Sequence, residues 1–277
     1  MIDALLAPFS LDFMVRGFIA ALVVGALCAA MGTYVVLRKL SFIGDGLSHA
    51  SFAGIVIAYI KGMDFYLGAA IVAVVTALGI GYVHRKGRVS LDTTIGVLFT
   101  GMFALGVFMM SRLKNYSVDL QDYLFGNILG VSQKDIVLIV VLAALVVVTL
   151  ALCYRSFMYA SFDPVVAEAS GIPTAALDYI LLVLLALTII VSISAVGIIL
   201  VAALLVTPAA AAFQLTRRFA RMMALSAVLG SLCAVGGLYL SYYLNAASGA
   251  TIVLLATLMF FAAMAIGRLR RGRLVPR

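Results

Sequence analysis

The run KDIVLIVVLAALVVVTLALCY, residues 134–154, decides the fold class because it carries no charged side chain after Asp135. A helix needs about 20 mostly apolar residues to cross the hydrocarbon core of a bilayer. Eight more runs of this kind lie at residues 14–37, 47–62, 64–83, 93–111, 176–194, 196–213, 222–243 and 249–266. The runs at 47–62 and 196–213 are among the short ones. We therefore expect an all-α polytopic bundle of about eight or nine transmembrane spans.

The composition of the whole chain is that of a membrane protein. Of its 277 residues, 65% are hydrophobic and 11% are charged, whereas a soluble domain has about 45–50% apolar and about 25% charged residues. The spans leave no stretch for a soluble catalytic domain, and phosphate-loop, H-E-x-x-H and G-x-S-x-G motifs are absent from the sequence. We expect a single membrane domain, residues 1–273, that is not an enzyme. Residues 274–277, LVPR, resemble the remnant of a protease-cleaved tag.

The net charge of +8 is distributed unevenly over the loops. Fourteen Lys and Arg residues fall in the loops on one side of the predicted bundle. The other side carries five, namely Arg16, Lys61, Arg112, Lys114 and Lys134. Because cytoplasmic loops are enriched in Lys and Arg, the C-terminus is expected in the cytoplasm and the N-terminus outside. The excess charge therefore indicates orientation and does not support a nucleic-acid site.

One segment places ionisable residues at membrane depth, SFIGDGLSHASFAG at residues 41–54. Asp45 and His49 are four residues apart, so in a helix they project from one face, with the hydroxyls of Ser48 and Ser51 nearby. Carboxylate oxygen with imidazole nitrogen suits a divalent first-row metal such as manganese, iron or zinc. The pair is only half a coordination sphere, and a twofold axis would supply four ligands. A structural salt bridge and a proton relay are the alternatives.

The loop RSFMYASFDPVVAEASGIPT, residues 155–174, is predicted to contain a short helix. Asp163 caps its start, Glu168 lies in its body and Gly171 ends it. A short amphipathic helix on the cytoplasmic side is what a membrane subunit would offer to a soluble partner. A connector that lies on the membrane surface is the alternative.

Two further positions bear on the architecture. Asp178 opens the sixth predicted span near the cytoplasmic interface, where a helix-end or salt-bridge role is favoured over a pore role. Thr207 and Pro208 are predicted to break the helix of the seventh span, either along the transport pathway or as a packing kink.

Five stretches, in order, resemble the membrane subunits of bacterial manganese, zinc and iron ABC importers. They are RKLSFIGDGLSHASFAGI, DYLFGNILGVS, SFDPVVAEASGI, VGIILVAALLVTPAAAA and SYYLNAASGATIVL. The resemblance runs from about Arg38 to Gly267. It implies an all-helical permease of the bacterial plasma membrane, similar in architecture to the cobalamin-type importers. Such a permease works as a dimer on two cytosolic ATPase subunits and takes metal from an extracellular binding protein.

The resemblance also implies roles for individual residues. The family segment G-D-A-L-S-H is matched by Gly44, Asp45, Leu47, Ser48 and His49, with Gly46 where Ala is frequent. Its Asp and His are pore metal ligands, which points to Asp45 and His49. The SFDPVVAEASGI stretch resembles the coupling helix that sits in a groove of the ATPase, which implies contacts from Asp163, Glu168 and Gly171.

The resulting expectation is an importer subunit whose substrate is a divalent metal ion and which holds no permanent cofactor. Manganese is favoured weakly over zinc or iron because the ligands are oxygen and nitrogen. A homodimer is favoured over a heterodimer with a related permease. The alternative function is an ion-gradient-driven secondary metal carrier or channel that uses Asp45 and His49 as a proton or cation relay.

Overall fold

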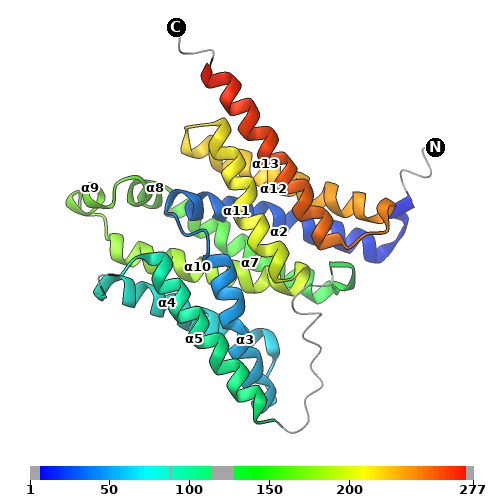
Figure 1. Cartoon of the computed structure of the whole chain (residues 1–277), viewed down its shortest axis with the longest axis horizontal. Coiled ribbons are helices and arrows are strands. Elements are labelled where there is room, and N and C mark those ends of the chain that lie inside the picture. Colours follow the sequence, from blue (N-terminus) through cyan, green and yellow to red (C-terminus); the bar gives the residue numbers. More distant parts are fainter. Residues whose placement is uncertain (1–6, 88, 114–127, 273–277) are drawn as a thin grey trace.

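The computed structural model describes residues 7–87, 89–113 and 128–272, and in this part of the chain nine helices are long and apolar enough to cross a membrane. They are α2 (Asp12–Leu37), α3 (Ile43–Lys61), α4 (Phe65–Lys86), α5 (Leu91–Ser111), α7 (Gln133–Leu152), α10 (Thr174–Val196), α11 (Ile198–Leu215), α12 (Phe219–Leu244) and α13 (Ser248–Gly272) (Figure 1). Two short 3-10 helices, η1 (Ala7–Ser10) and η2 (Ile128–Gly130), and two short helices, α8 (Tyr154–Phe162) and α9 (Pro164–Ala169), complete the described elements. The predicted all-α polytopic bundle is confirmed.

Two predicted features lie outside the described residues. Most of the DYLFGNILGVS stretch falls at 122–127, and the suspected tag remnant is 274–277.

The structure corrects the predicted start of the second span. The apolar run begins at residue 47, but α3 begins at Ile43. The glycines and Asp45 lower the hydropathy of this first turn without preventing a helix. Asp45 therefore lies within the helix and not in the preceding loop.

The break predicted at Thr207 and Pro208 is one of the hydrogen-bond ladder, and it does not end the helix. Helix α11 continues through Pro208, where the ring only removes one backbone donor, and the small residues Ala209 and Ala212 beside it are fully buried. The chain breaks instead at Gly197, which separates α10 from α11 with φ of 79°. A side chain disfavours this conformation, so glycine is the residue that permits the turn.

Helix α2 is the centre of the bundle, where it packs against α12, α11, α10 and α7. Its contact with α12 depends on glycine, because a Cβ on Gly25 would lie 2.7 Å from the carbonyl oxygen of Gly230. In lipid, helices associate through such close packing, because the hydrocarbon around them is as apolar as their side chains. Helices α3, α4 and α5 form a second group, in the lower part of Figure 1.

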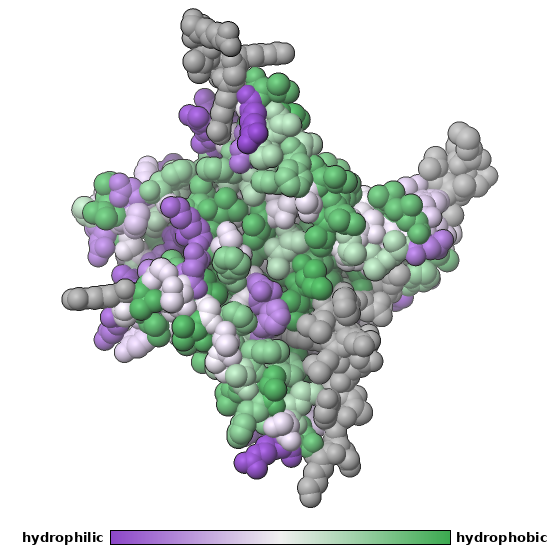
Figure 2. All heavy atoms as spheres, viewed as in Figure 1, coloured by the Kyte–Doolittle hydropathy of each residue, from purple (hydrophilic) through white to green (hydrophobic). Residues whose placement is uncertain are grey.

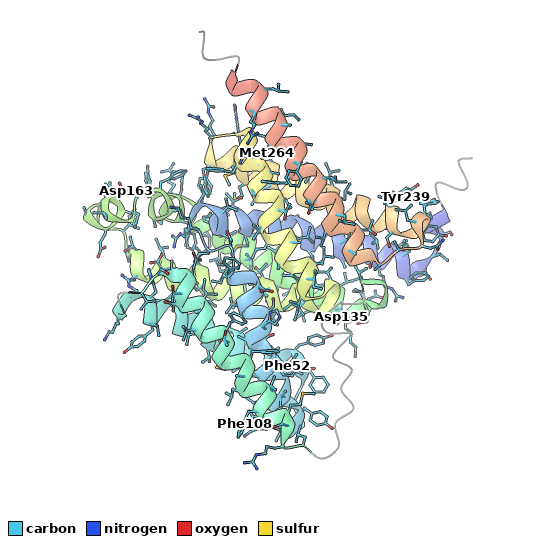
Figure 3. The ribbon with its side chains drawn as sticks, in the orientation of Figure 1. Phe52, Phe108, Asp135, Asp163, Tyr239 and Met264 are labelled. Atoms are coloured by element: carbon cyan, nitrogen blue, oxygen red, sulfur yellow. The ribbon has the colours of Figure 1, made fainter. Side chains whose placement is uncertain are left out.

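One end of the bundle, called the basic end here, collects the last residues of α2 and α4, the first turn of α10, and both short helices α8 and α9. An aromatic cluster fastens α8 there, with Tyr34 of α2 at 5.7 Å from the ring of Phe157 and 5.2 Å from that of Phe219. Figure 3 shows Asp163, the residue between α8 and α9, and Tyr239 on α12 at opposite sides of the molecule.

Apolar side chains cover much of the outer surface (Figure 2). The large exposed ones include Phe108 on α5, Val141 on α7 and Leu258 on α13. A soluble monomer rarely exposes so much contiguous apolar surface, whereas hydrocarbon is a suitable neighbour for it. The chain is a multi-pass membrane protein.

Candidate functional site

The connection between α2 and α3 is a tightly hydrogen-bonded turn. The N–H of Leu40 donates to the carbonyl of Val35 at 2.8 Å, and that of Lys39 donates to Val36 at 3.3 Å. This pattern is a Schellman motif, with Lys39 in the left-handed conformation at φ of 57°. Leu40 is buried beneath the turn. The position of α3 is therefore fixed directly by the end of α2.

The predicted pair lies on the first turns of α3 and shares one face. His49 Nδ1 is 3.4 Å from Asp45 Oδ1 and 2.9 Å from the backbone oxygen of Asp45. The side chain of Asp45 is 52% exposed and that of His49 is 27% exposed. With hydrogen on Nδ1, the imidazole donates to the Asp45 carbonyl and leaves Nε2 as the nitrogen with a lone pair. An open carboxylate beside an oriented imidazole can bind a cation.

Helix α5 forms an aromatic wall beside this pair. The ring of His49 meets those of Phe99 and Phe103 edge to face, at centroid distances of 5.9 and 5.7 Å. The wall approaches closely because of Gly46, where a Cβ would lie 2.7 Å from Cγ2 of Ile95. Gly46 therefore provides space for α5, and α3 remains a regular helix through it.

The two serines of the segment do not offer free hydroxyls to the pair. Ser48 donates to the carbonyl of Gly44 at 2.6 Å, and Ser51 donates to that of Ser48 at 2.6 Å. Both serines are buried, and such bonds to the preceding turn satisfy a hydroxyl inside a helix.

Asp45 and His49 together could offer a metal ion two side-chain ligands. Within residues 7–87, 89–113 and 128–272, no group of three or more His, Cys, Asp or Glu side chains gathers in a way that could hold a metal ion. A bound zinc usually has four ligands and harder cations have more. The described residues therefore offer this pair no third side-chain ligand of these types.

The predicted helix in the 155–174 loop is α9, and its signals act as expected. Asp163 Oδ1 accepts hydrogen bonds from the backbone N–H groups of Val165 and Val166, in the first turn of α9, at 3.1 and 3.0 Å. Glu168 is exposed in the last turn, and Gly171 has φ of 81° just beyond it. The carboxylate of Asp163 is thus engaged in capping, while Glu168 and Gly171 lie open on the surface.

Sequence reasoning missed the apolar surface that α8 and α9 form together. Tyr159 and Phe162 of α8 and Val165 and Val166 of α9 are between 54% and 76% exposed. Large exposed apolar side chains beside polar ones are typical of a protein-binding surface. The aromatic residues of YRSFMYASF were the signal in the sequence that could have identified it.

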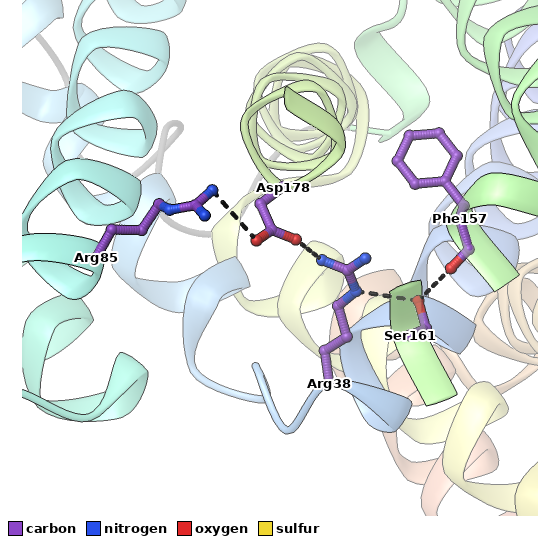
Figure 4. A network of polar contacts seen from close by, with 5 residues as sticks. All are labelled: Arg38, Arg85, Phe157, Ser161 and Asp178. Atoms are coloured by element: carbon purple, nitrogen blue, oxygen red, sulfur yellow. Dashed lines mark hydrogen bonds and ion pairs between the residues drawn. The ribbon is translucent and has the colours of Figure 1, made fainter. Parts of the chain in front are cut away.

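The prediction for Asp178 is confirmed, since it forms ion pairs at the basic end, with Arg38 and, at 4.0 Å, with Arg85 (Figure 4). In the sequence, Arg38 is one of the fourteen Lys and Arg residues on the basic side of the predicted bundle, and nothing there distinguishes it from the others. Its contacts with two other helices are long-range, and no local pattern indicated them.

Comparison with known proteins matches nearly the whole described chain. The sequence model of the ABC 3 transport family matches residues 10–267. The manganese transport system membrane protein MntC of Listeria monocytogenes is 43% identical over 252 residues, which are 91% of this chain and 90% of that protein. The chelated iron transport system membrane protein YfeD of Yersinia pestis is 37% identical over 257 residues, 93% of this chain and 86% of YfeD.

A solved structure is also similar. The chain matched in PsaBC from Streptococcus pneumoniae in complex with Fab has a TM-score of 0.83 and 33% sequence identity, with 95% of each chain covered. The family match includes the Asp45 and His49 pair and the whole of α8 and α9.

Proposed function

The chain belongs to the ABC 3 transport family, and from this premise we propose that it carries manganese into a bacterial cell through a site built on Asp45 and His49. It is a membrane permease of the manganese, zinc and iron ABC transporters, which are transport components and not enzymes. The observation that carries the proposal is the open carboxylate and oriented imidazole on one face of α3.

The site is completed by a second copy of the chain. Two Asp45 and His49 pairs facing each other across a twofold axis supply four ligands, and cyclic dimers are the commonest symmetric assembly. The 52% exposure of the Asp45 side chain within a single chain supports this arrangement, because the carboxylate is open to a partner. Two carboxylates also neutralise a divalent cation and lower its cost at membrane depth.

The basic end faces the cytoplasm in this proposal, as the distribution of Lys and Arg favours. Cytosolic ATPase subunits then bind α8 and α9, and the exposed apolar surface of these helices supports such a contact. An extracellular metal-binding protein delivers the ion to the opposite end. ATP-driven closure of the ATPase subunits changes the access to the site from one side to the other.

The ligand chemistry suits an ion that has to be released. Thiolates hold structural zinc in closed sites, whereas α3 contains no cysteine and the pair offers a carboxylate and an imidazole. Oxygen and nitrogen ligands favour manganese or iron slightly over zinc. Of the similar proteins, MntC belongs to a manganese transport system and YfeD to a chelated iron transport system.

The test is uptake of Mn²⁺ by the complete transporter reconstituted in vesicles. Asp45→Ala and His49→Ala should each abolish uptake, because each removes two of the four ligands in a homodimer. The matched controls are Asp92→Ala, at an exposed residue in the first turn of α5, and His84→Ala, at a half-buried residue in the last turn of α4. They should leave uptake unchanged.

Assembly is measured in the same preparations, since the site variants should still form the dimer and bind the ATPase. Uptake that survives both site substitutions would remove the pair from the mechanism. Elemental analysis of cells that express the transporter, with and without Asp45→Ala, identifies the metal. Accumulation of zinc or iron instead of manganese would correct the substrate.

A further inference from the structure

Arg38, the residue directly after α2, binds two other helices at the basic end (Figure 4). Its Nε donates to the hydroxyl of Ser161 on α8 at 3.0 Å, and its Nη1 pairs with Asp178 on α10. The side chain of Arg38 is only 13% exposed. Ser161 donates in turn to the carbonyl of Phe157 within α8, at 2.7 Å. We call these contacts of Arg38 with Ser161 and Asp178 the Arg38 bridge.

On one side, the bridge reaches the surface proposed to bind the ATPase. Ser161 is on the last turn of α8, and only Asp163 separates α8 from α9. The aromatic contacts of Phe157 hold α8 against α2 through apolar surface, which allows sliding. A guanidinium has fixed directions for its N–H groups, so its hydrogen bonds set one relative position of the helices.

On the other side, the bridge reaches the metal pair. Arg38 is the C-cap of α2, and the Schellman turn that follows leads directly into α3. Leu40 and Ile43 of this connection are buried, so the connection moves with α2 and α3 as one body. Asp45 is on the first turn of α3.

Asp178 can also release Arg38 without remaining unpaired. Nη1 of Arg85, on α4, lies 4.0 Å from Oδ2 of Asp178, and the side chain of Arg85 is 35% exposed. A partly buried acid with a second guanidinium nearby keeps a counter-charge if one partner moves away. Asp178 therefore has a second cationic partner within reach, which is a condition for a contact that changes partners when helices move.

We propose that the Arg38 bridge transmits movement of α8 and α9 to α3, and so couples the ATPase to the metal pair. This inference rests on the proposed function. Arg38 acts as a positioning residue, because it does not touch the metal.

The experiment compares variants that break the bridge with matched controls that do not. Arg38→Gln removes the contacts with both α8 and α10, and Arg85→Gln removes a charge from the same cluster without affecting α8. Ser161→Ala deletes the hydrogen bond between Arg38 and α8 and keeps the ion pair of Arg38 with Asp178; it also removes the bond of the hydroxyl to Phe157 within α8. Its control is Ser170→Ala, whose hydroxyl donates to the carbonyl of Val166 within its own helix.

Each variant is assembled with its ATPase and binding protein in vesicles, and Mn²⁺ uptake and ATP hydrolysis are measured on the same sample. Arg38→Gln should retain ATP hydrolysis within about twofold while Mn²⁺ transported per ATP falls by about tenfold or more, as for loss of a charge-assisted hydrogen bond. In Ser161→Ala, Mn²⁺ transported per ATP should fall by about threefold to tenfold. The affinity for Mn²⁺ and the amount of bound ATPase should be unchanged, which a merely structural role would not predict.

Equal transport per ATP in Arg38→Gln and Arg85→Gln would overturn the inference. Loss of ATPase binding in Arg38→Gln would also overturn it, because the bridge would then only support the docking surface. Should Arg38→Gln fail to fold, the comparison of Ser161→Ala with Ser170→Ala decides. Absence of Mn²⁺ uptake by the wild-type complex would instead overturn the proposed function, and this inference with it.

Discussion

Gly32→Ala tests the packing of α2 against α11, the helix that also contacts α3. A Cβ on Gly32 of α2 would lie 1.7 Å from the carbonyl oxygen of Leu205 on α11 and 3.2 Å from Cβ of Ala209. The Leu205 side chain also contacts α3, since a Cβ on Gly44 would lie 3.0 Å from its Cδ2. A methyl group at residue 32 therefore displaces α11 at the point where α11 contacts α3, the helix that carries Asp45.

The expected loss of stability follows from the distance between the added Cβ and the carbonyl oxygen of Leu205. Side-chain carbons in proteins essentially never approach closer than 3.0 Å, so the two helices must separate by more than about 1 Å. Overpacking lowers the free energy of unfolding by about 1–3 kcal/mol. Because the added methyl group meets backbone, which cannot rotate away as a side chain can, we expect a loss of about 3 kcal/mol. At about 2–4 °C per kcal/mol for a chain of this size, the Tm should fall by about 6–12 °C.

The assay is thermal unfolding of the purified chain in detergent, followed by Mn²⁺ uptake of the assembled transporter. The matched control is Gly79→Ala on α4, where a Cβ would make an ordinary contact of 3.7 Å with Leu98. Its effect should stay within about 0.5 kcal/mol. A Tm for Gly32→Ala equal to that of the control would refute the close packing of α2 on α11.

Three further outcomes are expected. Gly46→Ala should lower the Tm by a few degrees and reduce Mn²⁺ uptake, because a Cβ would meet buried Ile95 at 2.7 Å; an unchanged Tm would contradict the contact. Ser132→Ala should cost about 1 kcal/mol in thermal unfolding, since Ser132 and Asp135 form a capping box at the start of α7, and no loss would mean that the cap is replaced. The chain reconstituted alone with a proton gradient should not take up Mn²⁺, and uptake there would favour a secondary carrier.

The spans were predictable because each depends on local composition, but their ends were not. Helix α3 begins four residues before the apolar run, since its start is set by the hydrogen-bonded turn at Lys39 and Leu40. Pro208 does not end the helix of the seventh span, whereas Gly197, with a positive φ, separates α10 from α11. Turn geometry outweighs the propensity of a single residue when neighbouring helices hold the backbone.

The site shows the same division. Asp45 and His49 could be predicted because residues four apart in a helix are neighbours whatever the tertiary structure is. The Arg38 bridge could not, since Ser161 and Asp178 lie 123 and 140 residues away from Arg38. Only packing brings these residues together. Among the described residues, no third His, Cys, Asp or Glu joins the Asp45 and His49 pair, which is why the proposed function relies on a second copy of the chain.

Hydropathy and burial of the spans explain why the polar pair is tolerated where it is. Among the nine described spans, α3 has the lowest mean hydropathy and the largest buried share, whereas α7 has the highest mean hydropathy and is mostly exposed. A helix that faces hydrocarbon has to be apolar, but a helix sheltered by neighbours can carry a carboxylate and an imidazole at lower cost. The run at 134–154 thus reveals a membrane protein because it meets lipid. Function is therefore expected in α3, the span that its neighbours shield from lipid and whose sequence looks least like a transmembrane helix.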